Sequence, residues 1–167
     1  MRILPLTVLL GLAVLAGCVS EPTPPAQPSF YRDLASDDAI VDGAVAASMI
    51  SGFRANNGLG AVEIDPELTR IATDHARAMA AKDKVDRAAG REFSGRLTKA
   101  GFDGKGAVES VGAGYHTLAE AFSGWRDSPP HRANMLKGGV NRIGIATVYV
   151  PGSKYKVFWT LVLAAKE

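Results

Sequence analysis

The chain contains a single cysteine, Cys18, among 167 residues. One cysteine cannot form an intrachain disulfide. Because there is no second thiol, any modification of Cys18 would leave none for a thiolate metal site or a cysteine nucleophile. Basic and acidic residues are nearly balanced, 19 against 17, so the dense basic face that binds phosphate backbones is lacking. The composition therefore excludes a disulfide-stabilised domain and argues against nucleic acid as a partner.

The sequence also lacks a basic stop-transfer cluster behind its N-terminal apolar run. Residues 3–15 form that run after Arg2, and it is too short to span a bilayer comfortably. The run ends in Leu15-Ala16-Gly17-Cys18, which resembles a bacterial lipoprotein signal. The resemblance implies removal of residues 1–17, acylation of Cys18, and a lipid anchor on the exported side of a membrane, periplasmic or at the cell surface. An ordinary secretory signal that happens to contain a cysteine is the alternative.

A proline-rich segment follows Cys18. Its prolines fix φ and favour extended conformations, which predicts a semi-rigid tether. We therefore predict a lipidated cysteine and tether over residues 18–30. Residues 31–167 are expected to form one domain, large enough to bury a single core.

Apolar residues at helical spacing predict two helices in the first half of this domain. From Ser36 to Asn57 they fall near one face, and Asp37 and Asp38 suit the start of that helix. Asp65-Pro66 places an N-cap acid before proline at the first helical position, opening an alanine-rich helix.

The second half of the domain mixes shorter helices with strands, which predicts an α+β fold with helices packed on a small sheet. Thr117 to Glu120 fits a capping box, and Ser128-Pro129-Pro130 breaks the chain before another short helix. We expect helices over 94–100, 117–125 and 131–136, and strands over 107–115, 143–149 and 157–163, the last two forming a hairpin.

Three separated segments share the pattern of a known family. They are Asn57-Gly58-Leu59 with the alanine-rich helix behind it, Val108 to Gly114, and the W-x-x-S-P-x-H-R-x-N-x-L run from Trp125 to Leu136. Over residues 46–164 the chain resembles the CAP superfamily of SCP-like extracellular domains, which includes cysteine-rich secretory, antigen 5 and pathogenesis-related 1 proteins. The resemblance implies a three-layer α-β-α sandwich with a small, mainly antiparallel sheet and a central groove.

The resemblance also implies a groove that holds two histidines and two acidic residues. In some members of the family the histidines bind a divalent metal. Glu109 matches one acidic position and His131 matches the later histidine. Arg87 stands where the other histidine is expected, with Asp86 as the alternative at that position. We therefore expect Arg87, Glu109 and His131 to line the binding groove.

An arginine at that position argues against a metal centre. A zinc site needs at least three protein ligands with lone pairs, and a guanidinium only donates hydrogen bonds. We expect no tight metal site and no cofactor. The arginine would instead form an ion pair with Glu109 or bind an anionic group of a ligand.

Each of these residues also has a structural interpretation. Glu109 could hold the loops of the groove together, and His131 could brace the turn before its helix. His75 is expected to be a half-buried packing residue of the alanine-rich helix. Arg96, together with Arg87 and Arg91, could belong to a solvated face.

The favoured function is a membrane-tethered binding module for a lipid, a peptide or a cell-wall fragment. One alternative is a peptidase-like hydrolase with Glu109 as general base and His131 as acid or base. This activity is ranked lower, because a metal ligand is missing and no serine has a recognisable triad context. The other alternative is a structural protein of the cell envelope with a vestigial groove.

Overall fold

The fold was analysed in a computed structural model that describes residues 27–86, 93–102, 104 and 106–166. Helices dominate the first half of the described chain and strands the second half, as expected. The elements in chain order are η1 (Ser29–Tyr31), α1 (Gly43–Ala55), β1 (Glu63–Ile64), α2 (Pro66–Ala81), α3 (Phe93–Lys99), β2 (Val108–Ala113), α4 (Leu118–Asp127), α5 (Pro129–Met135), β3 (Arg142–Tyr149) and β4 (Val157–Ala164).

The strands form one four-stranded sheet in the order β1-β3-β4-β2. β3 and β4 pair as an antiparallel hairpin, and β2 pairs antiparallel with the other side of β4. β1 runs parallel to β3 and has only two residues, too few for an alternating pattern to reveal it in the sequence. The expected small, mainly antiparallel sheet is confirmed.

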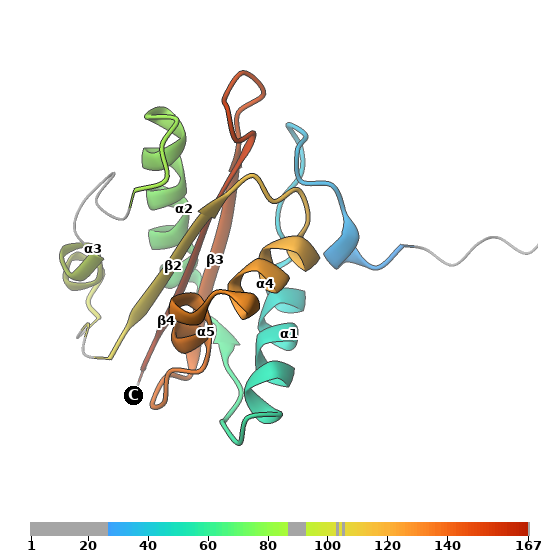
Figure 1. The fold of residues 1–167 in the computed structure, drawn as a ribbon. Coiled ribbons are helices and arrows are strands. Elements are labelled where there is room, and N and C mark those ends of the chain that lie inside the picture. Colours follow the sequence, from blue (N-terminus) through green and yellow to red (C-terminus); the bar gives the residue numbers. More distant parts are fainter. Residues whose placement is uncertain (1–26, 87–92, 103, 105, 167) are drawn as a thin grey trace, which may run out of the picture.

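Helices cover both faces of this sheet (Figure 1). α2 and α3 lie on one side, and α1, α4 and α5 lie on the other. β4 is buried along its whole length because its side chains point alternately into the two layers. Trp159 and Leu161 belong to the core on the α1 side, whereas Phe158 and Val162 face α2. The three-layer α-β-α sandwich is therefore confirmed.

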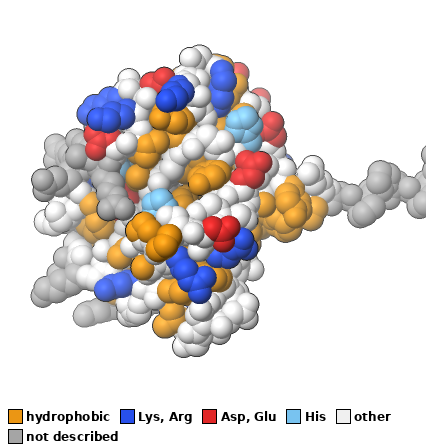
Figure 2. All heavy atoms as spheres, in the orientation of Figure 1, with side chains coloured by type: hydrophobic (Ala, Val, Ile, Leu, Met, Phe, Trp, Pro, Cys, Tyr) orange, Lys and Arg blue, Asp and Glu red, His pale blue; other side chains and the backbone are white. Residues whose placement is uncertain are grey.

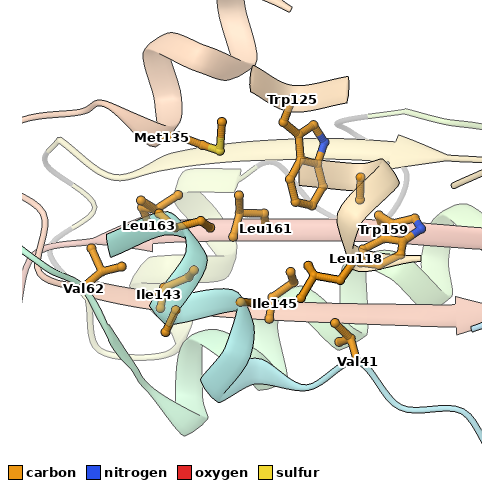
Figure 3. Close-up of a cluster of buried hydrophobic side chains, with 14 of the residues drawn as sticks. Val41, Val62, Leu118, Trp125, Met135, Ile143, Ile145, Trp159, Leu161 and Leu163 are labelled. Atoms are coloured by element: carbon orange, nitrogen blue, oxygen red, sulfur yellow. The ribbon is translucent and has the colours of Figure 1, made fainter. Parts of the chain in front are cut away.

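The larger core lies between the sheet and the layer of α1, α4 and α5 (Figure 3). Trp125 of α4 and Trp159 of β4 meet edge to face, with ring centroids 6.0 Å apart. Both indoles are almost fully buried. Met135 of α5 lies in the same core, so the short helix that carries His131 is anchored from beneath.

The first long helix begins later than the sequence suggested. Asp37 and Asp38 lie in a turn, and α1 starts at Gly43. Asp42 is its N-cap, since its Oδ1 accepts from the backbone nitrogen of Val45 at 3.0 Å. Acidic residues suit a helix start at several neighbouring positions, and the cap hydrogen bond decides among them.

The predicted caps of α2 and α4 are both present. Thr117 and Glu120 form the complete capping box of α4. Asp65 caps α2 by accepting from two backbone amides, and its other oxygen accepts from Lys166 Nζ at 2.7 Å. Burial by itself would raise the pKa of Asp65. The hydrogen bonds from Lys166 and the two amides outweigh that effect and lower the pKa below its usual value.

A buried arginine holds the loop between α5 and β3. Arg54 is 1% exposed, and burial lowers its pKa. Its guanidinium donates to the carbonyl oxygens of Gly60, Met135, Lys137 and Val140 at 2.7–3.3 Å.

Within the described part of the chain, no helix is long and apolar enough to cross a membrane.

α2 lies unusually close to the sheet because the residue of β3 beneath the helix is a glycine, Gly144. A side-chain carbon on Gly144 would overlap the carbonyl group of Leu68 and the backbone nitrogen of Thr69. On the helix side, Ala72 and Ala76 are fully buried, and their small side chains also allow α2 to lie close to the sheet. The position of α2, and of every side chain it carries, therefore depends on Gly144.

Replacing Gly144 with alanine should destabilise the fold by about 3 kcal/mol, because helix and strand must separate to admit the new methyl group. The matched control is Gly52→Ala on the exposed side of α1, where nothing lies within 4 Å of the added carbon. That change should be neutral or stabilising by up to about 1 kcal/mol. Urea unfolding measures both, and equal midpoints for the two variants would contradict the close approach.

Candidate functional site

Glu109 of β2 directs its carboxylate into the α2 side of the sheet. It is opposite Val162 in the register of β2 and β4, and Val162 packs in the core beneath α2. The Glu109 side chain is only 3% exposed. Because an unpaired buried carboxylate is very costly, this position requires partners.

Two side chains from different helices supply them. His75 of α2 places Nδ1 2.8 Å from Glu109 Oε1. Arg96 of α3 donates from Nη2 to the same oxygen, and that nitrogen lies 3.0 Å from His75 Nδ1. These three buried residues, the His75–Glu109–Arg96 cluster, join α2, α3 and β2.

The imidazole of His75 is fixed from its other side as well. Its Nε2 donates to the backbone oxygen of Asp86 at 2.9 Å. This bond orients the ring and leaves Nδ1 facing Glu109 and Arg96. His75 thus connects the cluster to the chain segment that follows α2.

The cluster corrects two expectations from the sequence. His75 is completely buried and bonded to Glu109, rather than half-buried and merely packed. Arg96 is 8% exposed and ion-paired, so it does not belong to a solvated face. A signal existed for His75, which shares the buried stripe of α2 with Ala72 and Ala76 and therefore needs a polar partner. The local sequence around Arg96 carries no comparable signal.

The predicted groove residues have different outcomes. Glu109 lies in the buried His75–Glu109–Arg96 cluster. Arg87 lies outside the described residues, so its expected pairing with Glu109 stays a prediction. Asp86, the alternative to Arg87, contributes its backbone oxygen to His75. The arginine found beside Glu109 is Arg96.

His131 lies in the first turn of α5 and is half-exposed. One turn later on the same helix, Asn134 donates from Nδ2 to the backbone oxygen of Glu109 at 2.8 Å and to Ser110 Oγ at 3.1 Å. α5 is thereby attached to β2 at Glu109. The structure therefore brings His131 and Glu109 onto adjacent elements.

The donor set around Glu109 does not fit a metal ion. Both ring nitrogens of His75 have partners, and a guanidinium already contacts Glu109 Oε1. Across the described ranges, His, Cys, Asp and Glu side chains form no group of three or more that could hold an ion. The internal cation of Arg96 takes the place next to the carboxylate.

A cleft that the sequence did not indicate lies near the start of β2. It has a volume of about 670 Å³. Its one described ammonium, Lys166 Nζ, is engaged by Asp65. The described lining residues are Glu67, Ala100, Gly101, Phe102, Gly104, Ala107, Gly139, Asn141, Ala164, Ala165 and Lys166.

Comparison with known proteins identifies the family. The profile of the cysteine-rich secretory protein family, CAP, matches residues 47–163. The chain therefore belongs to the CAP family. No curated protein matches the chain.

Solved structures share the fold at low sequence identity. An extracellular protein containing an SCP domain from Bacillus anthracis str. Ames has a TM-score of 0.63 at 19% identity, covering 73% of this chain and 39% of that one. A cysteine-rich secretory protein from Staphylococcus aureus has 0.55 at 19%, covering 73% and 38%. The chain thus spans about two fifths of each of these proteins. An outer surface protein from Borrelia burgdorferi has 0.62 at 17%, covering 77% and 98%.

Removing the cation from the cluster should be costly. Arg96→Met leaves Glu109 buried beside His75 without the guanidinium, and we expect a loss of about 3–5 kcal/mol in the free energy of unfolding. The control is Arg126→Met, which removes an exposed partner of Asp127 and should cost less than about 1 kcal/mol. Thermal and urea unfolding measure both, and similar losses would show that the Arg96 pair is not required.

Proposed function

We propose that the protein is an exported, membrane-tethered binding module whose groove takes a lipid, a peptide or a cell-envelope fragment. The observation that carries this proposal is the His75–Glu109–Arg96 cluster, in which the candidate catalytic carboxylate is buried and bound to an internal cation. A carboxylate in that state connects α2, α3 and β2 and is not poised to take a proton from a substrate. Figure 2 shows hydrophobic side chains gathered over the face that β2 crosses in Figure 1, with charged side chains around them.

The proposed location rests on the N-terminal segment and on the relatives. Leu15-Ala16-Gly17-Cys18 supports acylation at Cys18, and the proline-rich segment behind it suits a tether. Similar solved structures come from proteins described as extracellular or as an outer surface protein. We propose a lipid anchor on the exported side of a bacterial membrane.

The hydrolase alternative has less support from the geometry. A general base must reach the proton that it abstracts. Glu109 is almost fully buried, and its Oε1 faces Arg96 and His75 in the α2 layer. His131 is more accessible, but it belongs to α5, whose Met135 packs in the core on the other side of the sheet. Binding without turnover is therefore the function that the arrangement supports better.

Mass spectrometry of an organic extract from protein purified without a histidine tag tests the proposed function. We expect a reproducible, stoichiometric co-purified ligand. His131→Ala should reduce its retention about fivefold, because His131 lies beside β2 on the groove side. His116→Ala changes an exposed histidine beyond the end of β2 and is the matched control. An empty extract would count against a lipid ligand, and equal losses in both variants would count against the groove.

We further propose that the groove functions without a tightly bound metal. Zinc titrated into chelator-treated protein should show no stoichiometric binding at submicromolar concentration, because the nitrogens of His75 and the inner oxygen of Glu109 already have partners. Isothermal calorimetry measures this directly. Tight, stoichiometric binding that is lost in His131→Ala would overturn the proposal and locate the site.

A further inference from the structure

β2 is an outermost strand of the sheet, so one of its edges has no neighbouring strand in the described structure. In an antiparallel pair, successive residues direct their peptide groups alternately toward the partner and away from it. Gly114 donates its backbone N–H to the Val157 carbonyl at 2.9 Å, which sets this alternation. Val108, Ser110 and Gly112 therefore face β4, and Glu109, Val111 and Ala113 point outward.

One of these outward groups already binds an amide. The Glu109 carbonyl accepts from the carboxamide of Asn134 at 2.8 Å, the same donor chemistry that a neighbouring strand would supply. No described residue bonds the outward N–H and C=O groups of Val111 and Ala113. Val111 is only 7% exposed. Peptide groups this recessed are rarely left without a partner.

Only the first part of this edge is protected against strand addition. Natural edge strands are blocked by lysines, prolines, bulges or inward-pointing charges, or are covered by a helix or loop. β2 has no lysine or proline, and its one inward-pointing charge, Glu109, lies at the position that Asn134 of α5 covers. Beyond Val111 the side chains are minimal, since Gly112, Ala113 and Gly114 follow. This part of the edge is more accessible than Glu109 and Val111.

We propose that the edge of β2 binds a peptide in extended conformation, by adding it as a further strand bonded to Val111 and Ala113. This inference rests on the proposed binding function and names a peptide as the ligand. The repeat of about 6.8 Å between outward groups matches the alternate residues of a strand. A lipid chain has no donors or acceptors at that spacing. The recessed edge beside α5 suits a single chain better than the sheet of a second folded copy.

The decisive variant is Ala113→Pro. It removes one outward N–H and leaves every β2–β4 hydrogen bond intact, because Ala113 does not donate to β4, and proline is tolerated at such edge positions. Ala113→Val is the matched control, with similar added volume and the N–H retained. The probe is a random-peptide library selected on the full chain, followed by synthesis of the enriched peptide.

We expect the enriched peptide to bind Ala113→Pro about tenfold more weakly than the unaltered chain, and Ala113→Val within about twofold. The same peptide with alternate backbone nitrogens methylated should lose binding to the unaltered chain, a test that does not depend on the fold of any variant. Equal binding to Ala113→Pro and Ala113→Val, or no enrichment on the unaltered chain, would overturn the inference. A lipid in the organic extract would then still support the binding module, whereas an empty extract together with no enriched peptide would count against both.

Discussion

The fold on the α2 side of the sheet depends on the need to neutralise one buried carboxylate. Glu109 projects from an outer strand into an apolar layer, where an isolated charge would cost several kcal/mol. Arg96 of α3 supplies the opposing charge, and His75 of α2 contacts the same carboxylate oxygen. α3 is a short helix, held by this ion pair and by the packing of Leu97 and Phe93. The carboxylate thus fixes the positions of three consecutive elements of the chain, α2, α3 and β2.

The same residue also organises the opposite side of β2. While the Glu109 side chain is held in the α2 layer, its backbone oxygen faces outward and accepts from Asn134 of α5. α5 is further fixed from beneath by Met135 in the core and at its end by Arg54. His131 therefore stands on a rigid support beside the strand edge. In the proposed binding function, a ligand beside this edge would meet a surface that is already formed, which lowers the entropic cost of binding.

Local sequence patterns predicted the elements whose ends are set by residues close together in the chain. The Asp65-Pro66 start of α2, the Thr117 capping box and the β3–β4 hairpin each depend on neighbours in the chain, and all three are present. The start of α1 depended on which of several acids forms the cap hydrogen bond. The pairing of Arg96 with Glu109 depends on tertiary packing, and nothing near Arg96 in the sequence indicates it. The resemblance to the CAP family predicted the sandwich and drew attention to Glu109, but it did not predict the cluster that neutralises Glu109.

A shared fold does not fix the chemistry of the side chains placed on it. In this chain a guanidinium contacts the carboxylate where a metal ion would need open ligands, and it does so from within the protein. An internal cation cannot exchange, coordinate water or be removed by a chelator. It favours a permanent structural role for Glu109 and leaves recognition to the groups around Glu109.

These groups include the half-exposed imidazole of His131 and the outward peptide groups of Val111 and Ala113. Backbone groups at regular spacing select for conformation more than for side-chain identity, so this geometry favours a binding module that accepts a range of extended peptide sequences.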